Sequence, residues 1–140
     1  MLVRSFRLSD HVGTQGLLSN ALSETCYVDT MGAFAKQLSW DSELVMVAES
    51  DQQLVGMIIG TIDNNKGYYY RLAVHSDYRR RGIGKALIQA LRTKFQQRDV
   101  SRIVVNVDEH NRPILPVYEK AGYGTDDFLQ PQKPLKIMIS

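Results

Sequence analysis

The chain has 140 residues, of which 44% are hydrophobic and 23% charged, and its formal net charge is +2. This length fits a single compact domain over residues 1–140, because domains of roughly 100–150 residues are the commonest. The small net charge excludes a protein that binds nucleic acid through overall positive charge. No apolar run approaches the roughly 18 residues that cross a bilayer, so no membrane partner is predicted.

The N-terminus and the cysteine content indicate a cytoplasmic protein. The opening segment MLVRSFRLSD carries arginines within its apolar stretch and lacks the pattern of a secretion signal. The single cysteine, Cys26, cannot form an internal disulfide, and a lone thiol suits a reducing compartment. Its sequence neighbours supply no base, so we expect an inert thiol, although a spatial partner such as His75 stays open.

The first forty residues predict a strand and two helices. The apolar residues of the segment 3–8 fit a short strand, and Ser9-Asp10 offers an N-cap for a helix that reaches Leu22. A second, short helix is expected after Asp29-Thr30 and ends at Trp40-Asp41. Its apolar residues recur at i, i+3, i+4 and i+7: Met31, Phe34, Ala35 and Leu38.

The middle of the chain predicts three antiparallel strands. The runs 43–50 and 53–63 are joined by a hairpin loop at Ser50 to Gln53, and a turn at Asn64 to Gly67 leads to the run 68–75. Strict alternation in that last run places Tyr68, Tyr70, Leu72 and Val74 on one face and Tyr69, Arg71, Ala73 and His75 on the other.

The second half predicts a crossover unit and therefore a mixed sheet. An apolar stripe at Leu87, Ile88, Leu91 and Phe95 marks a helix, and the apolar run 102–107 fits a buried parallel strand. A further helix is expected before Gly122, which occupies the position of a C-terminal cap. Two short strands around Pro131 and Pro134 complete the predicted order.

The junction between the third strand of this middle region and the next helix reads Arg79-Arg80-Arg81-Gly82-Ile83-Gly84. A helix that begins here offers unpaired backbone N–H groups and a positive dipole end, which suits an anion. The glycines admit phosphate oxygens, and the arginines add charge-assisted donors. The spacing fits neither a Walker A loop nor a dinucleotide fingerprint. A basic surface turn without a ligand is the alternative.

With these residues the chain resembles the GNAT superfamily of N-acetyltransferases, which use acetyl-CoA. The family signature is Gln or Arg, two variable residues, Gly, one variable residue, then Gly or Ala, and residues 79–84 match it. Residues 72–75 look like the family's fourth strand, and residues 111–113 with 117–123 resemble its second cofactor-binding motif. The resemblance implies an α/β, single-domain GNAT-like fold: a mixed central sheet of about six to seven strands, with splayed parallel strands 4 and 5, flanked by about four helices.

The resemblance also implies site residues and no metal. Backbone amides of Arg81, Gly82, Ile83, Gly84 and Lys85 would hold the CoA pyrophosphate, beside Arg79 and Arg80. The cofactor arm would bind along the segment Leu72, Ala73 and Val74, and at Asn111. The oxyanion donor would be the Val74 N–H, and Tyr118 would contact the thioester sulfur and act as the general acid.

Two of these roles have structural alternatives, and two residues depart from the family pattern: Ile114, where the family often has a small alanine, and Pro116, two residues before Tyr118. Asn111 is also a good helix N-cap, and Tyr118 could be a core aromatic with its hydroxyl at the surface. Pro116 lacks an N–H and disfavours helical geometry at Leu115. We therefore expect the helix to start late; with Pro116 in the first helical position, Tyr118 lies in the first turn.

The implied reaction transfers the acetyl group of acetyl-CoA to a primary amine of a small molecule, peptide or protein, by direct attack through a tetrahedral intermediate. An alkyl ammonium must first lose a proton. The candidate bases are Glu49, Asp63, His75, Asp108 and Glu109, or water, and none is preferred. The acceptor would be shaped by residues 22–42 and 124–134, where Glu24, Asp29, Asp126 and Asp127 could attract a cation.

A second hypothesis, motivated by Pro116, is a catalytically weak module that binds CoA or acetyl-CoA for regulation or interaction. A third takes Arg79 to Arg81 with Arg71 and Lys85 as a nucleic-acid patch. It is disfavoured, because phosphate contacts along a nucleic acid need a broader basic surface. Later strands in such domains often pair between subunits, so a homodimer is a further expectation.

Overall fold

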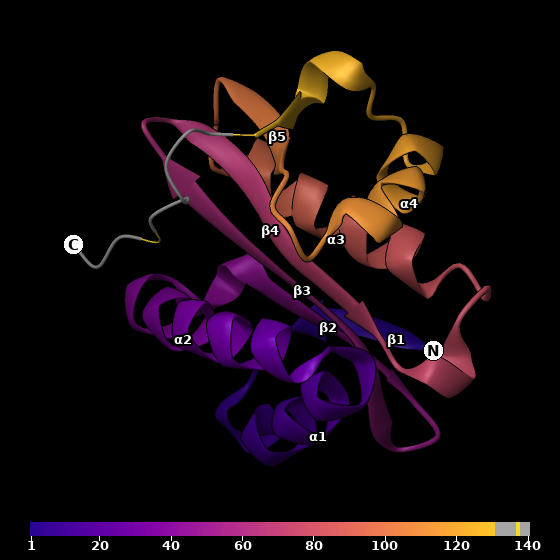
Figure 1. The fold of residues 1–140 in the computed structure, drawn as a ribbon. Coiled ribbons are helices and arrows are strands. Elements are labelled where there is room, and N and C mark those ends of the chain that lie inside the picture. Colours follow the sequence, from indigo (N-terminus) through magenta and orange to yellow (C-terminus); the bar gives the residue numbers. More distant parts are fainter. Residues whose placement is uncertain (131–136, 138–140) are drawn as a thin grey trace.

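The computed structural model describes residues 1–130 and 137, which form a sheet with helices on both faces (Figure 1). The strand order is β1-β2-β3-β4-β5-β6; the pairs from β1 to β4 are antiparallel, and β4–β5 and β5–β6 are parallel. The strands are β1 (Leu2–Ser5), β2 (Val45–Ser50), β3 (Gln53–Asp63), β4 (Lys66–Val74), β5 (Arg102–Asn106) and β6 (Phe128–Leu129). The helices are α1 (His11–Ala21), α2 (Glu24–Trp40), α3 (Ile83–Gln97) and α4 (Leu115–Lys120). The predicted mixed sheet with a parallel fourth and fifth strand is confirmed.

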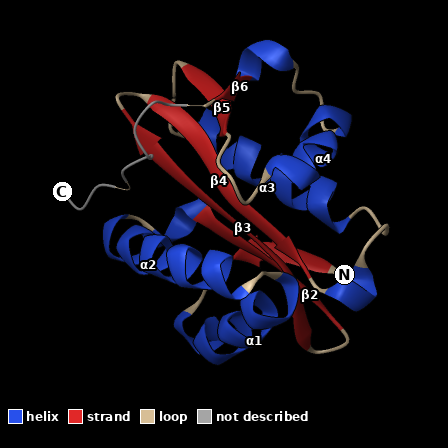
Figure 2. Cartoon of the chain, viewed as in Figure 1, coloured by secondary structure: helices blue, strands red, loops and turns tan. Residues whose placement is uncertain are grey.

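The helices of the first half of the chain cover one face of the sheet, and those of the second half cover the other. Figures 1 and 2 show α1 and α2 on one face and α3 and α4 on the other. Each face buries its own apolar cluster. The cluster under α3 and α4 includes Tyr69, Leu72, Leu87, Ile88, Leu91, Phe95 and Tyr118, and the cluster under α1 and α2 includes Leu17, Leu18, Phe34, Val47, Met57, Ile59 and Ala73. The sheet is therefore buried on both sides.

Two tight hairpins set the register of the central strands. Asp51 and Gln52, with φ of 53° and 64°, connect β2 to β3, and Asn64 and Asn65, with φ of 49° and 61°, connect β3 to β4. Two consecutive positive φ values are the mark of a type I′ turn, whose twist matches that of a hairpin. Both predicted turns are confirmed, but the second is shorter than predicted, since β4 begins at Lys66.

The predicted alternation along β4 is wrong, because the strand contains a β-bulge. Ile59 of β3 pairs with Arg71 but Gly60 pairs with Tyr69, so Tyr70 is an extra residue without a partner on β3. An extra residue shifts the side-chain period by one position. Tyr70 therefore joins Arg71 on the face covered by α2. Tyr69 and Leu72 both face α3.

The predicted bounds of the first elements also need correction. Helix α2 begins at Glu24 rather than after Thr30, and Ser23 caps it by accepting the N–H of Cys26 at 3.2 Å. The predicted N-cap Asp10 does precede α1, but its carboxylate binds Arg4 and not the helix N–H groups. Leu8, predicted in the opening strand, lies past the end of β1 with an exposed side chain.

No helix among the described residues is both long and apolar enough to cross a membrane. The predicted terminal strands around Pro131 and Pro134 lie outside the described residues. Within them the chain order ends with β6, which extends the parallel arrangement beyond β5.

Candidate active site

The candidate site is a gap between two parallel strands. β4 pairs with β5 only from Lys66 to Tyr69, although β4 continues to Val74. Beyond Tyr69 no residue in the described part of the chain forms a strand ladder on this edge of β4. The predicted splaying of the fourth and fifth strands is thereby confirmed.

Two residues of β4 direct backbone polar groups into the gap. His75 donates its N–H to Val55 of β3 at 2.8 Å. Because backbone groups alternate along an antiparallel ladder, Ala73 also faces β3, whereas Leu72 and Val74 face the gap. Ala73 was predicted as a cofactor contact, but its methyl lies in the cluster under α1 and α2, so it does not share this edge. Leu72 and Val74 have the orientation that binding of an extended ligand requires.

The turn from β4 to α3 presents a row of unpaired backbone donors. Arg80 and Gly82 adopt left-handed backbone conformations, with φ of 65° and 79°, and Gly82 is the N-cap of α3. The N–H groups from Arg81 to Lys85 donate to no acceptor among residues 1–130. Five such donors at the positive end of a helix form a site for an anion.

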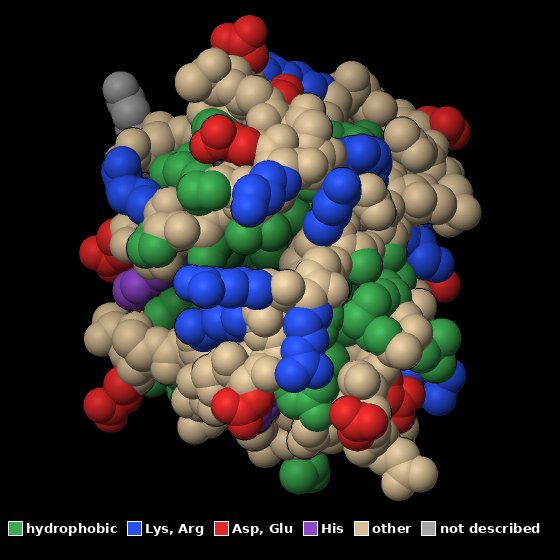
Figure 3. All heavy atoms as spheres, turned by 90° about the vertical axis from the view of Figure 1, so that its right-hand side faces the viewer, with side chains coloured by type: hydrophobic (Ala, Val, Ile, Leu, Met, Phe, Trp, Pro, Cys, Tyr) green, Lys and Arg blue, Asp and Glu red, His purple; other side chains and the backbone are tan. Residues whose placement is uncertain are grey.

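Cationic side chains surround this turn. Arg79 donates to the carbonyl oxygen of Val74 at 3.4 Å, and the guanidinium of Arg81 lies 4.8 Å from the centre of the Tyr78 ring. Arg80 and Lys85 are exposed. Figure 3, which faces the right-hand side of Figure 1, shows Lys and Arg side chains bordering a hollow with apolar atoms at its floor. The face that carries the start of α3 and α4 is thus suited to a ligand with both phosphate and apolar parts.

The two glycines of the turn, Gly82 and Gly84, differ in the space that surrounds them. A Cβ on Gly82 would meet nothing within 4 Å, so the surface beside its amide is open. A Cβ on Gly84 would lie 3.0 Å from Val117 and 3.3 Å from Leu72. Gly84 therefore allows α3 to approach α4 and β4 closely, while the predicted role of the two glycines in admitting phosphate stays a prediction.

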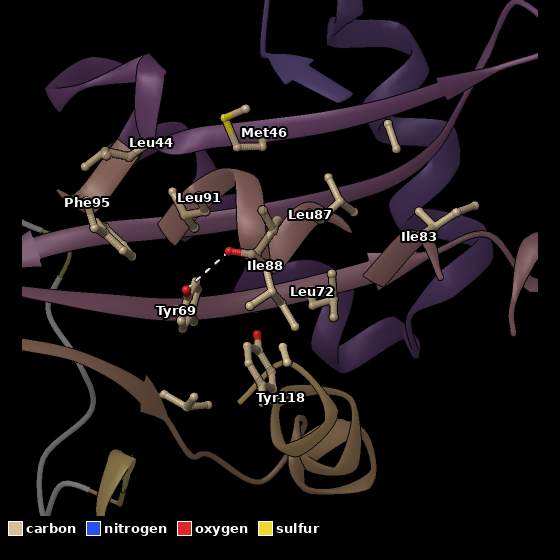
Figure 4. Close-up of a cluster of buried hydrophobic side chains, with 14 of the residues drawn as sticks. Leu44, Met46, Tyr69, Leu72, Ile83, Leu87, Ile88, Leu91, Phe95 and Tyr118 are labelled. Atoms are coloured by element: carbon tan, nitrogen blue, oxygen red, sulfur yellow. Dashed lines mark hydrogen bonds between the residues drawn. The ribbon is translucent and has the colours of Figure 1, made fainter. Parts of the chain in front are cut away.

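The hydroxyl of Tyr118 is buried and has no hydrogen-bond partner. The side chain is 0% exposed, and burial raises the pKa of its phenol. In Figure 4 the ring extends from α4 with its hydroxyl directed toward the region of Leu72 and Ile88. The alternative of a core aromatic with a surface hydroxyl is therefore wrong. An unsatisfied buried hydroxyl costs roughly 1–3 kcal/mol, which favours a function that uses it.

Helix α4 starts late, as predicted, but Pro116 is its second residue and not its first. A 3-10 turn over Arg112–Ile114 precedes it. At the other end, Gly122 has φ of 105°, and the N–H of Tyr123 donates to the carbonyl of Tyr118 at 3.1 Å. This Schellman cap fixes the short helix at its C-terminus. Pro116 costs α4 no internal hydrogen bond, because an N–H at the second helical position has no partner within the helix.

Asn111 is buried, and its side chain organises the loop after β5. Its Nδ2 donates to the carbonyl of Asn106, and its Oδ1 accepts the N–H of Asp108 at 2.9 Å. Asn111 does occupy the N-cap position of the 3-10 turn Arg112–Ile114, as the alternative supposed, but its side chain makes no cap hydrogen bond. A contact of Asn111 with the cofactor arm stays a prediction.

Two of the candidate bases lie far from the gap. Asp63 ends β3 beside Lys66, and β4 then rises about 26 Å over eight residues before it reaches Val74. Glu49 belongs to β2, which is separated from β4 by β3 and hence by about 10 Å. It lines a cavity of about 560 Å³ between α1 and the β2–β3 hairpin, which His75 also lines.

Two further candidates have their basic atoms engaged. The Nδ1 of His75 accepts the N–H of Asp77 at 3.1 Å, so the proton of the neutral ring belongs on Nε2 and no basic nitrogen is left. The Asp108 carboxylate binds both terminal nitrogens of Arg71 at 3.1 Å. Its Oδ1 also accepts the N–H groups of His110 and Asn111.

Sequence reasoning missed the contributions of two residues to this region. Arg71 was named only as part of a surface patch, yet it is buried against Thr30 of α2 and joins β4 to Asp108. His110 was not considered, although it contacts Asp29 of α2 and its neighbour Glu109. The only local signal was the polar run Asp108-Glu109-His110-Asn111 directly after a buried strand.

Comparison with known proteins agrees with this geometry. The family model described as the acetyltransferase (GNAT) family matches residues 16–123. The chain belongs to this family. It therefore catalyses acetyl transfer from acetyl-CoA as an acyltransferase, and acetyl-CoA is its cosubstrate.

Individual relatives of this GNAT protein support the assignment. An acetyltransferase of Yersinia pestis is 38% identical over 100 residues, which is 71% of either chain. The structure resembles the PaiA N-acetyltransferase of Thermoplasma acidophilum in complex with coenzyme A, with a TM-score of 0.70, 18% identity and coverage of 88% and 89%. It also resembles the ribosomal-protein-S18-alanine N-acetyltransferase of Escherichia coli, with a TM-score of 0.65, 20% identity and coverage of 86% and 76%. These two structures establish the likeness of the fold.

Proposed function

We propose that this acetyltransferase acts on a primary amine of a small molecule or peptide, which attacks the thioester directly. One arrangement carries the proposal. Leu72 and Val74 direct backbone groups into the gap beside β5, of which the Val74 carbonyl accepts from Arg79, and the buried hydroxyl of Tyr118 has no partner among the described residues. The backbone groups suit the extended arm that carries the thioester, and the Tyr118 hydroxyl suits the thioester sulfur.

Binding of acetyl-CoA would depend mainly on backbone atoms. The free N–H groups from Arg81 to Lys85 would bind the diphosphate, and Arg80 and Lys85 would add charge. A helix dipole contributes only about 0.3–1 kcal/mol at an exposed end, so several amides must act together. The N–H and carbonyl groups of Leu72 would bind the amides of the arm, together with the Val74 carbonyl if Arg79 releases it, which leaves the Val74 N–H for the oxyanion.

The proposed chemistry forms one bond and breaks another. The amine nitrogen bonds to the thioester carbon, and the Val74 N–H stabilises the negative charge that develops on the carbonyl oxygen. The carbon–sulfur bond then breaks, and the sulfur receives the proton of the Tyr118 hydroxyl; the new amide nitrogen gives up its extra proton, which restores that hydroxyl. Because burial raises its pKa, Tyr118 is protonated at neutral pH and can supply that proton. No acetylated enzyme is formed.

A panel of amines tests the proposal. Purified protein would be incubated with acetyl-CoA and with polyamines, aminoglycosides, and peptides bearing a free N-terminus or lysine, while release of the CoA thiol is followed. We expect release that depends on one amine class, with the acetyl group found on its nitrogen. Tight binding of acetyl-CoA without release across the whole panel would instead support the binding module.

A further inference from the structure

Three side chains from two distant segments meet on the α2 face of the sheet. The Nε2 of His110 lies 3.1 Å from Oδ2 of Asp29 and 3.4 Å from Oε1 of Glu109. Asp29 comes from α2, whereas the other two follow β5. The imidazole is 14% exposed, and the carboxylates are 54% and 80% exposed. The histidine is thus the sheltered member, and the carboxylates lie between it and solvent.

These contacts assign the proton on the neutral imidazole of His110. A carboxylate can only accept a hydrogen bond, so the nitrogen beside Asp29 and Glu109 must carry the proton. The lone pair then belongs to Nδ1, which has no hydrogen-bond partner among the described residues. A carboxylate that holds one nitrogen of a histidine while the other nitrogen takes up a proton is an effective arrangement for general-base catalysis.

A short chain of contacts connects the loop of His110 to β4. Its backbone N–H donates to Oδ1 of Asp108 at 2.9 Å, and Asp108 binds Arg71 of β4. Arg71 lies three residues before Val74, the proposed oxyanion donor. The loop that carries His110 is therefore tied to the strand on which the reaction is proposed to occur.

Each of the other titratable groups packed around His110 is hydrogen-bonded to a neighbour or protonated. Asp108 accepts four N–H donors, from Arg71 and from the backbone of the loop, so its lone pairs are engaged. The Tyr70 hydroxyl lies 3.5 Å from Arg71, and burial raises its pKa, which keeps it protonated at neutral pH. Asp29 and Glu109 face the Nε2 side of the ring.

On this geometry, and resting on the transferase function proposed above, we propose that His110 is the general base for the acceptor. Its Nδ1 takes a proton from the ammonium group of the acceptor, and the freed amine nitrogen then attacks the thioester carbon. Asp29 is a positioning residue that holds the ring in the required tautomer. Asp29 and Glu109 also stabilise the imidazolium that results. The acceptor is accordingly an alkyl amine, which is cationic before it reacts.

The test compares two acceptors that differ in basicity. One is the best alkyl amine found in the panel, and the other is an analogue whose amine is already neutral at pH 7, such as an arylamine or hydrazide. For His110→Gln we expect kcat/KM toward the alkyl amine to fall by about 10²–10⁴-fold. We expect a loss of less than about threefold toward the neutral amine, because no proton has to be removed before attack. Asp29→Asn should show the same pattern with a smaller loss.

The matched control is His11→Gln, which changes an exposed histidine of α1 that is outside the site. It should retain wild-type rates with both amines, and His110→Gln should retain wild-type affinity for acetyl-CoA. Equal losses toward the two amines would overturn the proposal, because His110 would then act only through structure. The proposal would also be overturned if His110→Gln kept the rates of the wild type. Loss of activity of the wild-type enzyme on addition of EDTA would overturn it as well. Absence of amine-dependent release by the wild type is a separate result, which rejects the transferase function itself.

Discussion

Arg71 and Asp108 connect β4 and the end of β5 just beyond the point where the backbone pairing of the two strands stops. The guanidinium reaches both carboxylate oxygens at 3.1 Å, and the arginine side chain is 3% exposed. Its Nε also donates to Thr30 of α2 at 3.0 Å. This ion pair and its further partners hold the end of β5 to β4 on the α2 face, whereas Tyr118 packs on the α3 face.

Breaking this pair should destabilise the protein. Asp108→Asn retains the shape of the side chain but leaves the Arg71 charge uncompensated, so we expect the free energy of unfolding to fall by about 3 kcal/mol. The measurement is urea denaturation followed by circular dichroism. The double variant Arg71→Met with Asp108→Asn should lose less than the sum of the single variants, since neither charge remains. A loss below about 0.5 kcal/mol for Asp108→Asn would show that the pair is not a fixed element.

Charge placed at Gly82 should weaken cofactor binding. Asn and Asp both tolerate a left-handed backbone better than other side chains, and the space around a Cβ here is open. The matched pair Gly82→Asn and Gly82→Asp therefore differs mainly in a negative charge beside the predicted diphosphate. We expect the Kd for CoA, measured by calorimetry, to rise roughly tenfold or more in Asp relative to Asn. Added salt should reduce the difference. Equal affinities would place the diphosphate elsewhere.

Removing the Tyr118 hydroxyl should lower turnover without lowering stability. For Tyr118→Phe we expect kcat to fall by about 10²-fold with little change in acetyl-CoA affinity. The free energy of unfolding should be unchanged or higher, because the hydroxyl has no partner to lose. Tyr69→Phe is the control: its hydroxyl contacts the Tyr123 hydroxyl at 2.5 Å and donates to Ile88 at 3.2 Å, so it should cost about 1 kcal/mol. Wild-type turnover in Tyr118→Phe would remove Tyr118 from the acid role.

The ion pair of Arg4 and Asp10 should make stability depend on acid pH. The hydrogen bonds from Arg4, at 2.7 and 2.8 Å, lower the pKa of Asp10 below its usual value. Stability from a lowered carboxyl pKa is present above the unfolded value of about 3.9 and is lost as the pH falls through the folded value. Asp10→Asn should therefore lose about 1–3 kcal/mol at neutral pH, and the difference from wild type should shrink below about pH 4. Melting temperatures across this range would measure it; a constant difference would contradict it.

Much of the fold follows from local patterns. The stripe along α3, the two Asp-Gln and Asn-Asn turns, and the Gly122 cap are encoded by neighbouring residues, so periodicity and turn chemistry predict them. The start of α2 was missed because its first turns contain Thr25, Cys26, Tyr27 and Val28, which are weak helix formers. The helical conformation of that segment depends on its packing against the sheet. The bulge at Tyr70 depends on pairing with β3, which the sequence of β4 alone does not specify.

The site, too, combines features that neighbouring residues predict with features that depend on contacts between distant segments. The motif of residues 79–84 predicts the backbone donors, and Tyr118 was singled out from its place in a second motif. By contrast, Arg71 with Asp108 and Asp29 with His110 are separated by 37 and 81 residues. Only the assembled sheet and helices bring these pairs together, and no local spacing indicates them.

A crystal structure with bound acetyl-CoA tests the central claim most directly. We expect the diphosphate oxygens within about 3.2 Å of the backbone nitrogens between Arg81 and Lys85. The thioester should lie between β4 and β5, with its sulfur beside the Tyr118 hydroxyl and its arm bonded to Leu72 and Val74. Diphosphate held by arginine side chains alone, or a thioester outside the gap, would contradict the account.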